Sequence, residues 1–336
     1  MIDAIIFILI FILFYTYIGY PLLLRVLNHF FADPVKSDRS FQPEIAIVIS
    51  AYNEEEYIED TINSIFKCEY PEDKLRVFIG SDGSSDKTLE ICYKLQEKHP
   101  NLNVFDYPRA GKNLTLNKLV PKTTADYIFL MDADCRLKKG ILQKMVSYFA
   151  DDSVGIVLGS AVHIAKKEDE DDTGRLGDTF YHKYERNIRI LESNIFSTVN
   201  SFGPFYAITR DCYEPIPNNR VCDDYYPILK TIQKDKRVIF CKDDHIYEVR
   251  EKSLMDEFNR RLRSTTCGMA SVWLEKRIFS PRYKWASLFL ISHKIFRWLN
   301  PFLLILLALL TLMLADGEYL KLPLVLCKQH YIYLLS

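Results

Sequence analysis

Apolar runs of strand length alternate with helical stripes through the middle of the chain. Residues 45–51 form a continuous apolar run rich in branched side chains, which is typical of a strand buried on both faces. Similar runs predict further strands at residues 75–80, 102–107, 127–131, 154–160, 205–208 and 238–241. Helical periodicity lies between several of these runs. The alternation predicts an α/β domain with a mainly parallel sheet and helices on both faces.

Helical stripes predict which side chains face the sheet. Two sets share a helical face, namely Ile58, Ile62, Ile65 and Phe66 in the first helix and Leu89, Cys92 and Tyr93 in the second. The spacing of Asn53 and Glu56 predicts a capping box at the start of the first helix. Further helical segments are predicted at residues 114–120, 227–234 and 260–276.

The chain begins with an apolar run long enough to cross a membrane. Residues 4–24 carry no charged side chain, and a helix of this length spans about 30 Å of hydrocarbon. Asp3 precedes the run, whereas Arg25 and Arg39 follow it, so the later residues are expected on the cytoplasmic side and a cleaved signal peptide is not indicated. We therefore predict a transmembrane anchor over residues 1–32.

A second apolar run, residues 299–315, is shorter and opens with an Asn-Pro pair. It is expected to be a tilted or re-entrant membrane segment, and residues 285–298 mix apolar and basic side chains as in a helix lying in the membrane interface. Buried core helices of a soluble protein are the alternative for both ends. The prediction is a cytoplasmic domain over residues 33–283, followed by an interfacial helix and a membrane segment over residues 284–336.

Charge and cysteine content narrow the classes of function. The chain has 43 basic and 44 acidic residues, so no broad basic field indicates a nucleic-acid partner. Its eight cysteines include no Cys-x-x-Cys pair and are interpreted as buried, reduced thiols. The acidic run at residues 168–172 is predicted to be a solvated loop, and the tail after residue 320 is too polar to predict a third span.

Polar and acidic side chains follow the predicted strands. Tyr52 and Glu54 come after the first strand, Asp82 after the second, and Asp132 and Asp134 after the fourth. Because ligands of open parallel sheets bind at the carboxyl ends of the strands, these side chains are expected to line one site.

The pair Asp132 and Asp134 fits a metal site. Two carboxylates at a strand end can hold a hard divalent cation and leave positions for substrate oxygens, and a departing diphosphate needs such an ion. The alternative is a turn whose acids cap a helix. A second Asp-x-Asp pattern, at Asp169 and Asp171, is set aside because it lies in a charged loop with no strand before it.

Three other candidates stay open on residue chemistry alone. Asp82, in a Ser-Asp-Gly-Ser turn, is either a turn former or an acceptor for a nucleotide base or ribose. Asp224 follows Asp223; adjacent carboxylates raise each other's proton affinity, which suits a general base, but the pair would also suit a helix N-terminus. Arg260 and Arg263 share a helical face, which suits either phosphate oxygens or anionic lipid.

Taken in order, these motifs resemble the family-2 glycosyltransferases, the GT-A fold enzymes that include cellulose, chitin and hyaluronan synthases. The matching segments are residues 43–55, 70–71, 76–88, 111–112 with Asn117, 129–134, 203–207, 223–224, and 292–294 with Arg297, Trp298 and Pro301. The last segment is similar to the membrane-proximal helix of the bacterial hyaluronan-synthase-like branch. The ordered set is specific, whereas no single motif is.

The resemblance implies a role for each matching residue. Residues assigned to the nucleotide-sugar donor are Ala51, Tyr52, Glu54, Asp82, Lys112, Asp132, Arg260 and Arg263. Asp134, with Asp132, would bind Mg²⁺ or Mn²⁺, and Asp224 would deprotonate the acceptor hydroxyl. The implied reaction is a single displacement with inversion at the anomeric carbon, in which metal and arginine stabilise the departing diphosphate.

The expected protein is an inverting glycosyltransferase anchored in the bacterial cytoplasmic membrane, with its catalytic domain on the cytoplasmic side. It would move a sugar from a nucleotide sugar, with UDP as the expected nucleotide, to a glycan or lipid-linked acceptor in cell-surface polysaccharide synthesis, with membrane lipid as a further partner. A processive synthase is the alternative within the family, but residues 260–264 lack the tryptophan of its Gln-x-x-Arg-Trp motif. Alternatives from other classes are a sugar nucleotidyltransferase and a catalytically silent sugar-nucleotide-binding subunit.

Overall fold

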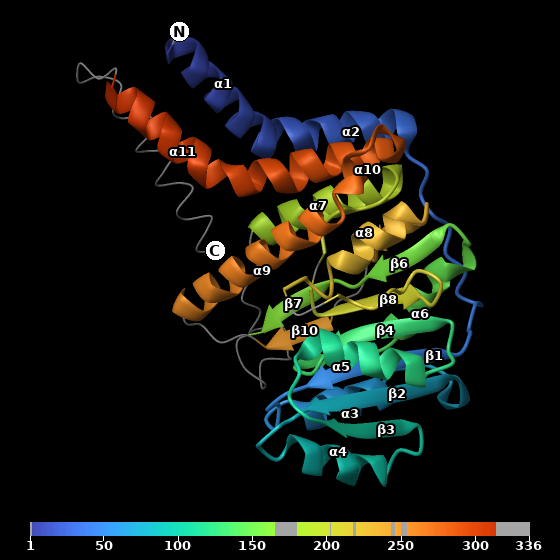
Figure 1. Cartoon of the computed structure of the whole chain (residues 1–336). Helices are drawn as coiled ribbons and strands as arrows, with labels where there is room; N and C mark the ends of the chain where they lie inside the picture. Colours follow the sequence, from blue (N-terminus) through green and yellow to red (C-terminus); the bar gives the residue numbers. More distant parts are fainter. Residues whose placement is uncertain are drawn as a thin grey trace.

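A seven-stranded sheet, with strand order β3-β2-β1-β4-β8-β6-β9, forms the centre of the molecule (Figure 1). Its strands are β1 (Ile45–Ala51), β2 (Leu75–Asp82), β3 (Leu102–Tyr107), β4 (Tyr127–Asp132), β6 (Val154–Leu158), β8 (Phe205–Thr209) and β9 (Arg237–Phe240). Neighbouring strands are parallel except at β8, which runs antiparallel to β4 and β6. The predicted mainly parallel sheet is therefore confirmed.

The computed structural model describes residues 2–164, 180–201, 203–217, 220–242, 246–249 and 254–313. The predicted acidic loop at residues 168–172, the Asp169 and Asp171 pattern within it, and the tail after residue 320 lie outside these ranges. A second, three-stranded sheet pairs β5 (Cys135–Arg136), β10 (Ile246–Val249) and β7 (Ala161–Ile164). The seven cysteines in the described ranges are free thiols, in agreement with the sequence.

Strand β1 shows why the sheet has two hydrophobic faces. Successive strand side chains point to opposite faces, so Ile45, Ile47 and Ile49 belong to one core, whereas Ala46 and Val48 belong to the other. The strand pairs with β2 over its whole length on one side and with β4 on the other. A continuous apolar run is therefore needed here, because both faces of this central strand are covered.

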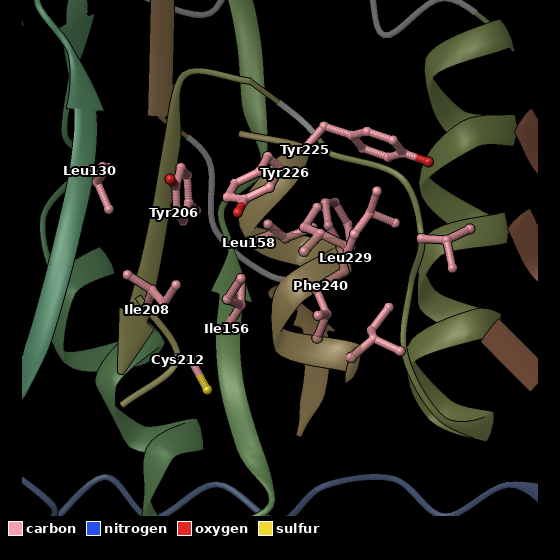
Figure 2. Close-up of a cluster of buried hydrophobic side chains, with 14 of the residues drawn as sticks. Leu130, Ile156, Leu158, Tyr206, Ile208, Cys212, Tyr225, Tyr226, Leu229 and Phe240 are labelled. Carbon is pink, nitrogen blue, oxygen red and sulfur yellow. The ribbon is translucent and has the colours of Figure 1, made fainter. Parts of the chain in front are cut away.

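Helices cover both faces of the sheet. One face is covered by α3 (Ile58–Phe66), α4 (Thr88–Gln96) and α6 (Ile141–Val146), and the other by α5 (Lys112–Leu119), α7 (Phe180–Ile195) and α8 (Tyr226–Gln233). Figure 2 shows part of the second core, where Tyr206, Tyr225 and Phe240 are buried together. The long helix α9 (Leu254–Leu274) packs against α8.

The two ends of the described chain lie side by side as antiparallel helices, here called the terminal helix pair (Figure 1). The first helix consists of α1 (Ile2–Phe14), a π-helical turn (Tyr15–Gly19) and α2 (Tyr20–Phe31). The second consists of a short turn (Pro281–Tyr283), α10 (Lys284–Phe289), a π-helical turn (Leu290–Ile295) and α11 (Phe296–Met313). The hydroxyl of Tyr15 lies 2.8 Å from the hydroxyl of Ser292, so the two π-helical turns meet.

The inner and outer halves of this pair have different surroundings. Tyr20 and Leu24 of the inner half are fully buried in the same core as α7. The outer halves, α1 and α11, project away from the sheet in Figure 1 and expose large apolar side chains such as Phe7, Phe11 and Phe302. Each helix is long and apolar enough to cross a membrane, judged by length and composition.

The start of α3 differs from the prediction. The helix begins at Ile58 with Tyr57 as its N-cap residue, and no capping box forms at Asn53 and Glu56. Asn53 has a positive φ of 55°, and its side-chain oxygen instead accepts a hydrogen bond from the Ser85 N–H. A contact with a residue 32 positions away in the sequence has replaced the local one.

One other helix prediction was also wrong in detail. In α4, Tyr93 is 45% exposed, because the face toward the sheet passes through Cys92 and Leu95. At the C-terminal end, Pro301 lies inside α11, and α11 packs against α1.

Leu24→Ala is expected to lower the free energy of unfolding by about 2–5 kcal/mol, because it deletes a fully buried side chain and leaves a cavity. Leu22→Ala, at a neighbouring leucine that is 49% exposed, is the matched control and should cost less than about 1 kcal/mol. Denaturant unfolding in detergent measures both changes. Equal effects would mean that the inner half does not belong to the core.

Candidate active site

Strand polarity brings the candidate residues to one edge of the sheet. β1, β2 and β4 are parallel, so their carboxyl ends meet at that edge. β8 is antiparallel, so the residues before it, Gly203 and Pro204, reach the same edge, where the Asp132 N–H donates to the Pro204 carbonyl at 2.9 Å. A narrow pocket here is lined by Lys112, Leu116, Leu130, Met131, Asp132, Gly203, Pro204, Tyr206 and Asp223.

Lys112 connects the two sides of this pocket. It is the first residue of α5, and its Nζ lies 2.5 Å from Asp132 Oδ1 and 2.6 Å from Asp223 Oδ2. Burial alone would lower the pKa of this ammonium, but the carboxylates of Asp132 and Asp223 raise it well above its usual value. Lys112 is therefore a fixed positive charge between the end of β4 and the acidic pair at residues 223–224.

Asp82, at the end of β2, is fully buried and binds the loop before α5. Its carboxylate accepts hydrogen bonds from the N–H groups of Ala110 and Gly111, from the Thr115 hydroxyl and from Arg109. Direct contact between this carboxylate and a nucleoside, as the sequence predicts, would require Arg109 to move aside.

Gly83 follows Asp82 and permits this close approach. It has a positive φ of 71°, and a Cβ atom at this position would lie 2.7 Å from the Arg109 backbone nitrogen. Both the conformation and the space therefore demand glycine. The turn at residues 82–83 and the loop at residues 109–111 form one unit.

The residues after β1 form the outer wall of the site. Ala51 ends the strand and is buried, whereas Tyr52 is 41% exposed and its ring centroid lies 3.5 Å from the Arg109 guanidinium carbon. The Glu54 N–H donates to the Thr88 hydroxyl at 2.7 Å. Burial, followed by repulsion from Asp132, raises the pKa of Glu54 to about 7.

Asp132 ends β4 and Asp134 lies in the turn that follows it, so the two carboxylates do not cap a helix. The next element is the short strand β5, which excludes the helix-capping alternative. Within the residues that the structure describes, no cluster of three or more His, Cys, Asp or Glu side chains is arranged to hold a metal ion. A metal at this pair would therefore take further ligands from substrate or water.

Asp224 is held from the β8 side of the pocket. Its Oδ2 accepts a hydrogen bond of 3.1 Å from the Gly203 N–H, and it also interacts with the Ser201 hydroxyl. Burial and the neighbouring charge of Asp223 raise the pKa of Asp224 to about 6. The N-cap alternative is wrong, because Tyr225 is the N-cap residue of α8 and no side chain caps that helix.

The helical turn that carries Arg260 and Arg263 lies beside the segment that holds Asp224. The Cys222 Sγ is 3.7 Å from the carbonyl oxygen of Ser264 in α9. Further along α9, the Ser271 hydroxyl accepts a hydrogen bond from the Cys222 N–H at 3.3 Å. The predicted phosphate-binding arginines thus belong to a helix that contacts Cys222, the residue before the acidic pair.

Two features of the site did not emerge from sequence reasoning. The Arg109 guanidinium pairs with the Asp82 carboxylate and lies over the ring of Tyr52. The Gly203 N–H donates a hydrogen bond to Asp224. A signal for Arg109 existed in its position just before Gly111 and Lys112, whereas the contact of Gly203 with Asp224 depends on the antiparallel direction of β8.

Comparison with known proteins identifies the enzyme class. Residues 46–210 match the family model described as "Glycosyl transferase family 2". The protein contains a family 2 glycosyltransferase domain. Two similar curated proteins are the beta-monoglucosyldiacylglycerol synthase of Synechocystis sp., 31% identical over 116 residues, and the poly-beta-1,6-N-acetyl-D-glucosamine synthase of Staphylococcus aureus, 32% identical over 117 residues. Each match covers 34% of this glycosyltransferase but only 24% and 28% of those relatives.

A solved structure agrees with the glycosyltransferase along its whole length. The mannosyltransferase of Pyrobaculum calidifontis, determined with GDP-Man and Mn²⁺, has a TM-score of 0.75 and 21% sequence identity, and the match covers 100% of this chain and 93% of that one. At this level of identity the likeness concerns the fold. It confirms the predicted GT-A fold.

Gly83→Ala is expected to destabilise this glycosyltransferase more than Gly140→Ala does. Both glycines have a positive φ, but a Cβ at Gly83 collides with the Arg109 backbone, whereas nothing lies within 4 Å of one at Gly140. Gly140→Ala, the control, should lower the free energy of unfolding by about 1 kcal/mol, and Gly83→Ala should lower it by at least about 1–3 kcal/mol more. Denaturant unfolding measures the difference, and equal losses would show that the 109–111 loop does not depend on this close approach.

Proposed function

We propose that this glycosyltransferase moves a sugar from a nucleotide sugar to an acceptor hydroxyl at a membrane surface, with inversion at the anomeric carbon. The observation that carries the proposal is the bridge from Lys112 to Asp132 and Asp223. Asp132, at the end of β4, and Asp223, of the acidic pair at residues 223–224, line the same pocket, which supports a single site. A donor bound on one side and an acceptor bound on the other would meet there.

The donor side consists of the ends of β1, β2 and β4. Ala51, Tyr52, Glu54 and Asp82 would bind the nucleoside, with the exposed ring of Tyr52 available for stacking. The permanent positive charge of Lys112 would face the diphosphate. Arg260 and Arg263, whose helix contacts Cys222 beside the acidic pair, would bind phosphate oxygens as the diphosphate departs.

Asp132 and Asp134 would hold the divalent cation. Two part-exposed carboxylates fit a hard ion such as Mg²⁺ or Mn²⁺, because such ions prefer oxygen ligands and leave positions for water and phosphate. The mannosyltransferase of similar fold was determined with Mn²⁺ and GDP-Man. When bound, the ion would neutralise the charge that develops on the diphosphate.

Asp224 would act as the general base. Its carboxylate would take the proton of the acceptor hydroxyl while the acceptor oxygen forms a bond with the anomeric carbon. The bond from that carbon to the diphosphate breaks on the opposite side, and the nucleoside diphosphate leaves with the bonding electrons. One such displacement inverts the anomeric centre.

The outer halves of the terminal helix pair would place the enzyme in the bacterial cytoplasmic membrane with its active site on the cytoplasmic side. Their exposed apolar side chains are suited to lipid, and Arg25 follows the first apolar run. The acceptor would be a glycan or a lipid-linked molecule, and UDP is the nucleotide that we expect. The two curated relatives are named as synthases of a glycolipid and of a polysaccharide.

Asp134→Asn is expected to reduce donor turnover at least about 100-fold, because the metal loses one of its two carboxylates. Membranes containing the protein are incubated with UDP-glucose, UDP-GlcNAc or GDP-mannose and Mn²⁺ or Mg²⁺, and the released nucleotide is identified. Asp152→Asn, at an exposed carboxylate outside the pocket, is the control. Full turnover by Asp134→Asn would overturn the metal assignment, and release of pyrophosphate would identify a nucleotidyltransferase.

The rate of transfer is expected to fall about tenfold per pH unit below pH 6. The pKa of Asp224 is raised to about 6, so acidification below that value protonates the base and removes its ability to accept a proton. Asp224→Asn should abolish transfer while changing the donor KM less than threefold, roughly, since it leaves the β1, β2 and β4 ends intact. An unchanged rate in this variant would remove Asp224 from the mechanism.

A further inference from the structure

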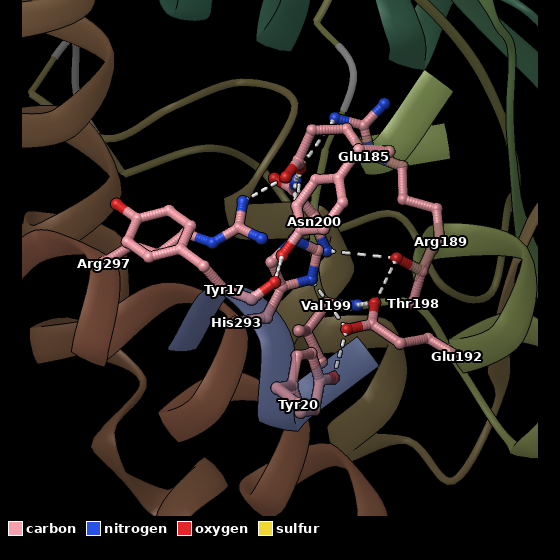
Figure 3. A network of polar contacts seen from close by, with 11 residues as sticks. Tyr17, Tyr20, Glu185, Arg189, Glu192, Thr198, Val199, Asn200, His293 and Arg297 are labelled. Carbon is pink, nitrogen blue, oxygen red and sulfur yellow. Dashed lines mark hydrogen bonds and ion pairs between the residues drawn. The ribbon is translucent and has the colours of Figure 1, made fainter. Parts of the chain in front are cut away.

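A buried polar cluster joins the terminal helix pair to α7 (Figure 3). His293, in the π-helical turn before α11, is fully buried between two glutamates of α7, with Nδ1 2.7 Å from Glu192 Oε1 and Nε2 3.2 Å from Glu185 Oε2. The Tyr20 hydroxyl of α2 donates to Glu192 at 2.5 Å, and Arg297 of α11 pairs with Glu185. The second helix of the pair therefore binds both carboxylates, and the first helix binds one of them, Glu192.

These contacts are strong because the groups have little access to water. Burial by itself would raise the pKa of Glu185, but Arg297 and His293 hold it well below its usual value. A buried carboxylate that loses such a partner is left as an uncompensated charge. The two glutamates of α7 thus require the terminal helix pair to be in place.

The same two glutamates bind the segment between α7 and β8. The Thr198 hydroxyl donates to Glu192 Oε2 at 2.8 Å, and the Asn200 side-chain nitrogen donates to Glu185 Oε2 at 3.0 Å. Asn200 also lies 3.5 Å from His293 Nε2. Thr198 and Asn200 of this segment therefore bind the two glutamates of the cluster.

At its C-terminal end, the segment between α7 and β8 binds Asp224. The Ser201 hydroxyl interacts with this carboxylate, and the Gly203 N–H donates to Oδ2 at 3.1 Å. The contacts to the cluster at Thr198 and Asn200 lie only a few residues from the contacts to Asp224. A shift of the cluster would consequently be passed to Asp224 over a very short stretch of backbone.

A second contact supports the connection. The Lys294 ammonium, adjacent in sequence to His293, lies 5.3 Å from the ring centroid of Tyr225, which directly follows Asp224. The turn that carries His293 therefore contacts Asn200, in the segment that binds Asp224, and Tyr225, the residue after Asp224.

We propose that Asn200 is a positioning residue, which transmits the docking of the terminal helix pair to the Asp224 carboxylate through the contacts of Ser201 and Gly203. The inference rests on the proposed role of Asp224 as the base. With the helix pair docked on α7, the segment holds Asp224 toward the acceptor; with the pair displaced, the base loses its alignment while the donor side, built on β1, β2 and β4, is retained. Acceptor deprotonation then depends on an intact membrane-proximal assembly.

The test compares Asn200→Ala with Tyr184→Phe. Both variants remove one side-chain hydrogen-bonding group near the terminal helix pair. The Tyr184 hydroxyl, however, donates to the Tyr17 carbonyl within that pair, and phenylalanine keeps its ring. Asn200→Ala should lower kcat for transfer about 10- to 100-fold, with the donor KM and the affinity for the nucleoside diphosphate with Mn²⁺ changed less than about twofold. Tyr184→Phe should retain all three quantities.

The pH profile adds a readout that a loss of folding would not produce. Besides Ser201 and Gly203, the groups facing Asp224 are Asp223, Cys222 and Tyr225 on its own segment, Lys112 of α5, Tyr206 of β8 and Lys294 of the terminal helix pair. Asn200→Ala leaves these groups unchanged but loosens the hydrogen bonds that stabilise the charged carboxylate. The acid limb should therefore move to higher pH.

Hydrogen exchange in the substrate-free protein separates this inference from the proposed function. Faster exchange of the Gly203 amide in Asn200→Ala, with wild-type exchange in Tyr184→Phe, would support the connection whatever reaction is catalysed. Thr198→Val, which keeps the side-chain shape, should act in the same direction if Asn200→Ala fails to fold. Unchanged kcat, pH profile and exchange, or an equal loss of donor affinity, would overturn the positioning role, whereas absence of transfer in the wild type would contradict the proposed function alone.

Discussion

The geometry of the site depends on the two ion pairs that the Lys112 ammonium makes with carboxylates. This ammonium lies within ion-pair distance of Asp132, at the end of β4, and of Asp223, in the segment before α8. Without this positive charge, carboxylates from the two sides of the pocket would repel one another across a short distance. The ion pairs hold the acidic groups together in the absence of ligand and keep a cation where a phosphate-bearing substrate is expected.

The loop before α5 illustrates how the edge of a parallel sheet becomes a shaped site. Asp82 uses its buried carboxylate to fix the backbone N–H groups of Ala110 and Gly111, and this sets the start of the helix that carries Lys112. Charge-assisted hydrogen bonds to backbone N–H groups are among the stronger ones in proteins. The position of Lys112 is therefore determined by a residue of the neighbouring strand as well as by its own helix.

The terminal helix pair contributes to the enzyme in two ways. Its outer halves expose apolar side chains. Its inner halves are part of the core and, together with Arg297 at the start of α11, bind the buried glutamates of α7. Buried ion pairs contribute little net stability, but removing one partner is costly because a charge is left in an apolar environment. The cluster is thus better suited to enforcing one docked arrangement than to strengthening the fold.

The sequence alone determined the central strands, the acidic residues after them, the glycosyltransferase family and the two apolar ends. These features depend on local patterns: β1, with its run of branched side chains, was predicted with its exact bounds, and Asp132 and Asp134 follow β4 as expected. Tertiary structure decided how the residues are used. The antiparallel direction of β8 brings the Gly203 N–H to the Asp224 carboxylate. Arg109 pairs with the Asp82 carboxylate, and the Asn53 side chain accepts a hydrogen bond from the Ser85 N–H instead of capping a helix. The physical reason is that each of these contacts joins residues at least 21 positions apart, whose approach depends on packing of the whole domain rather than on neighbouring side chains.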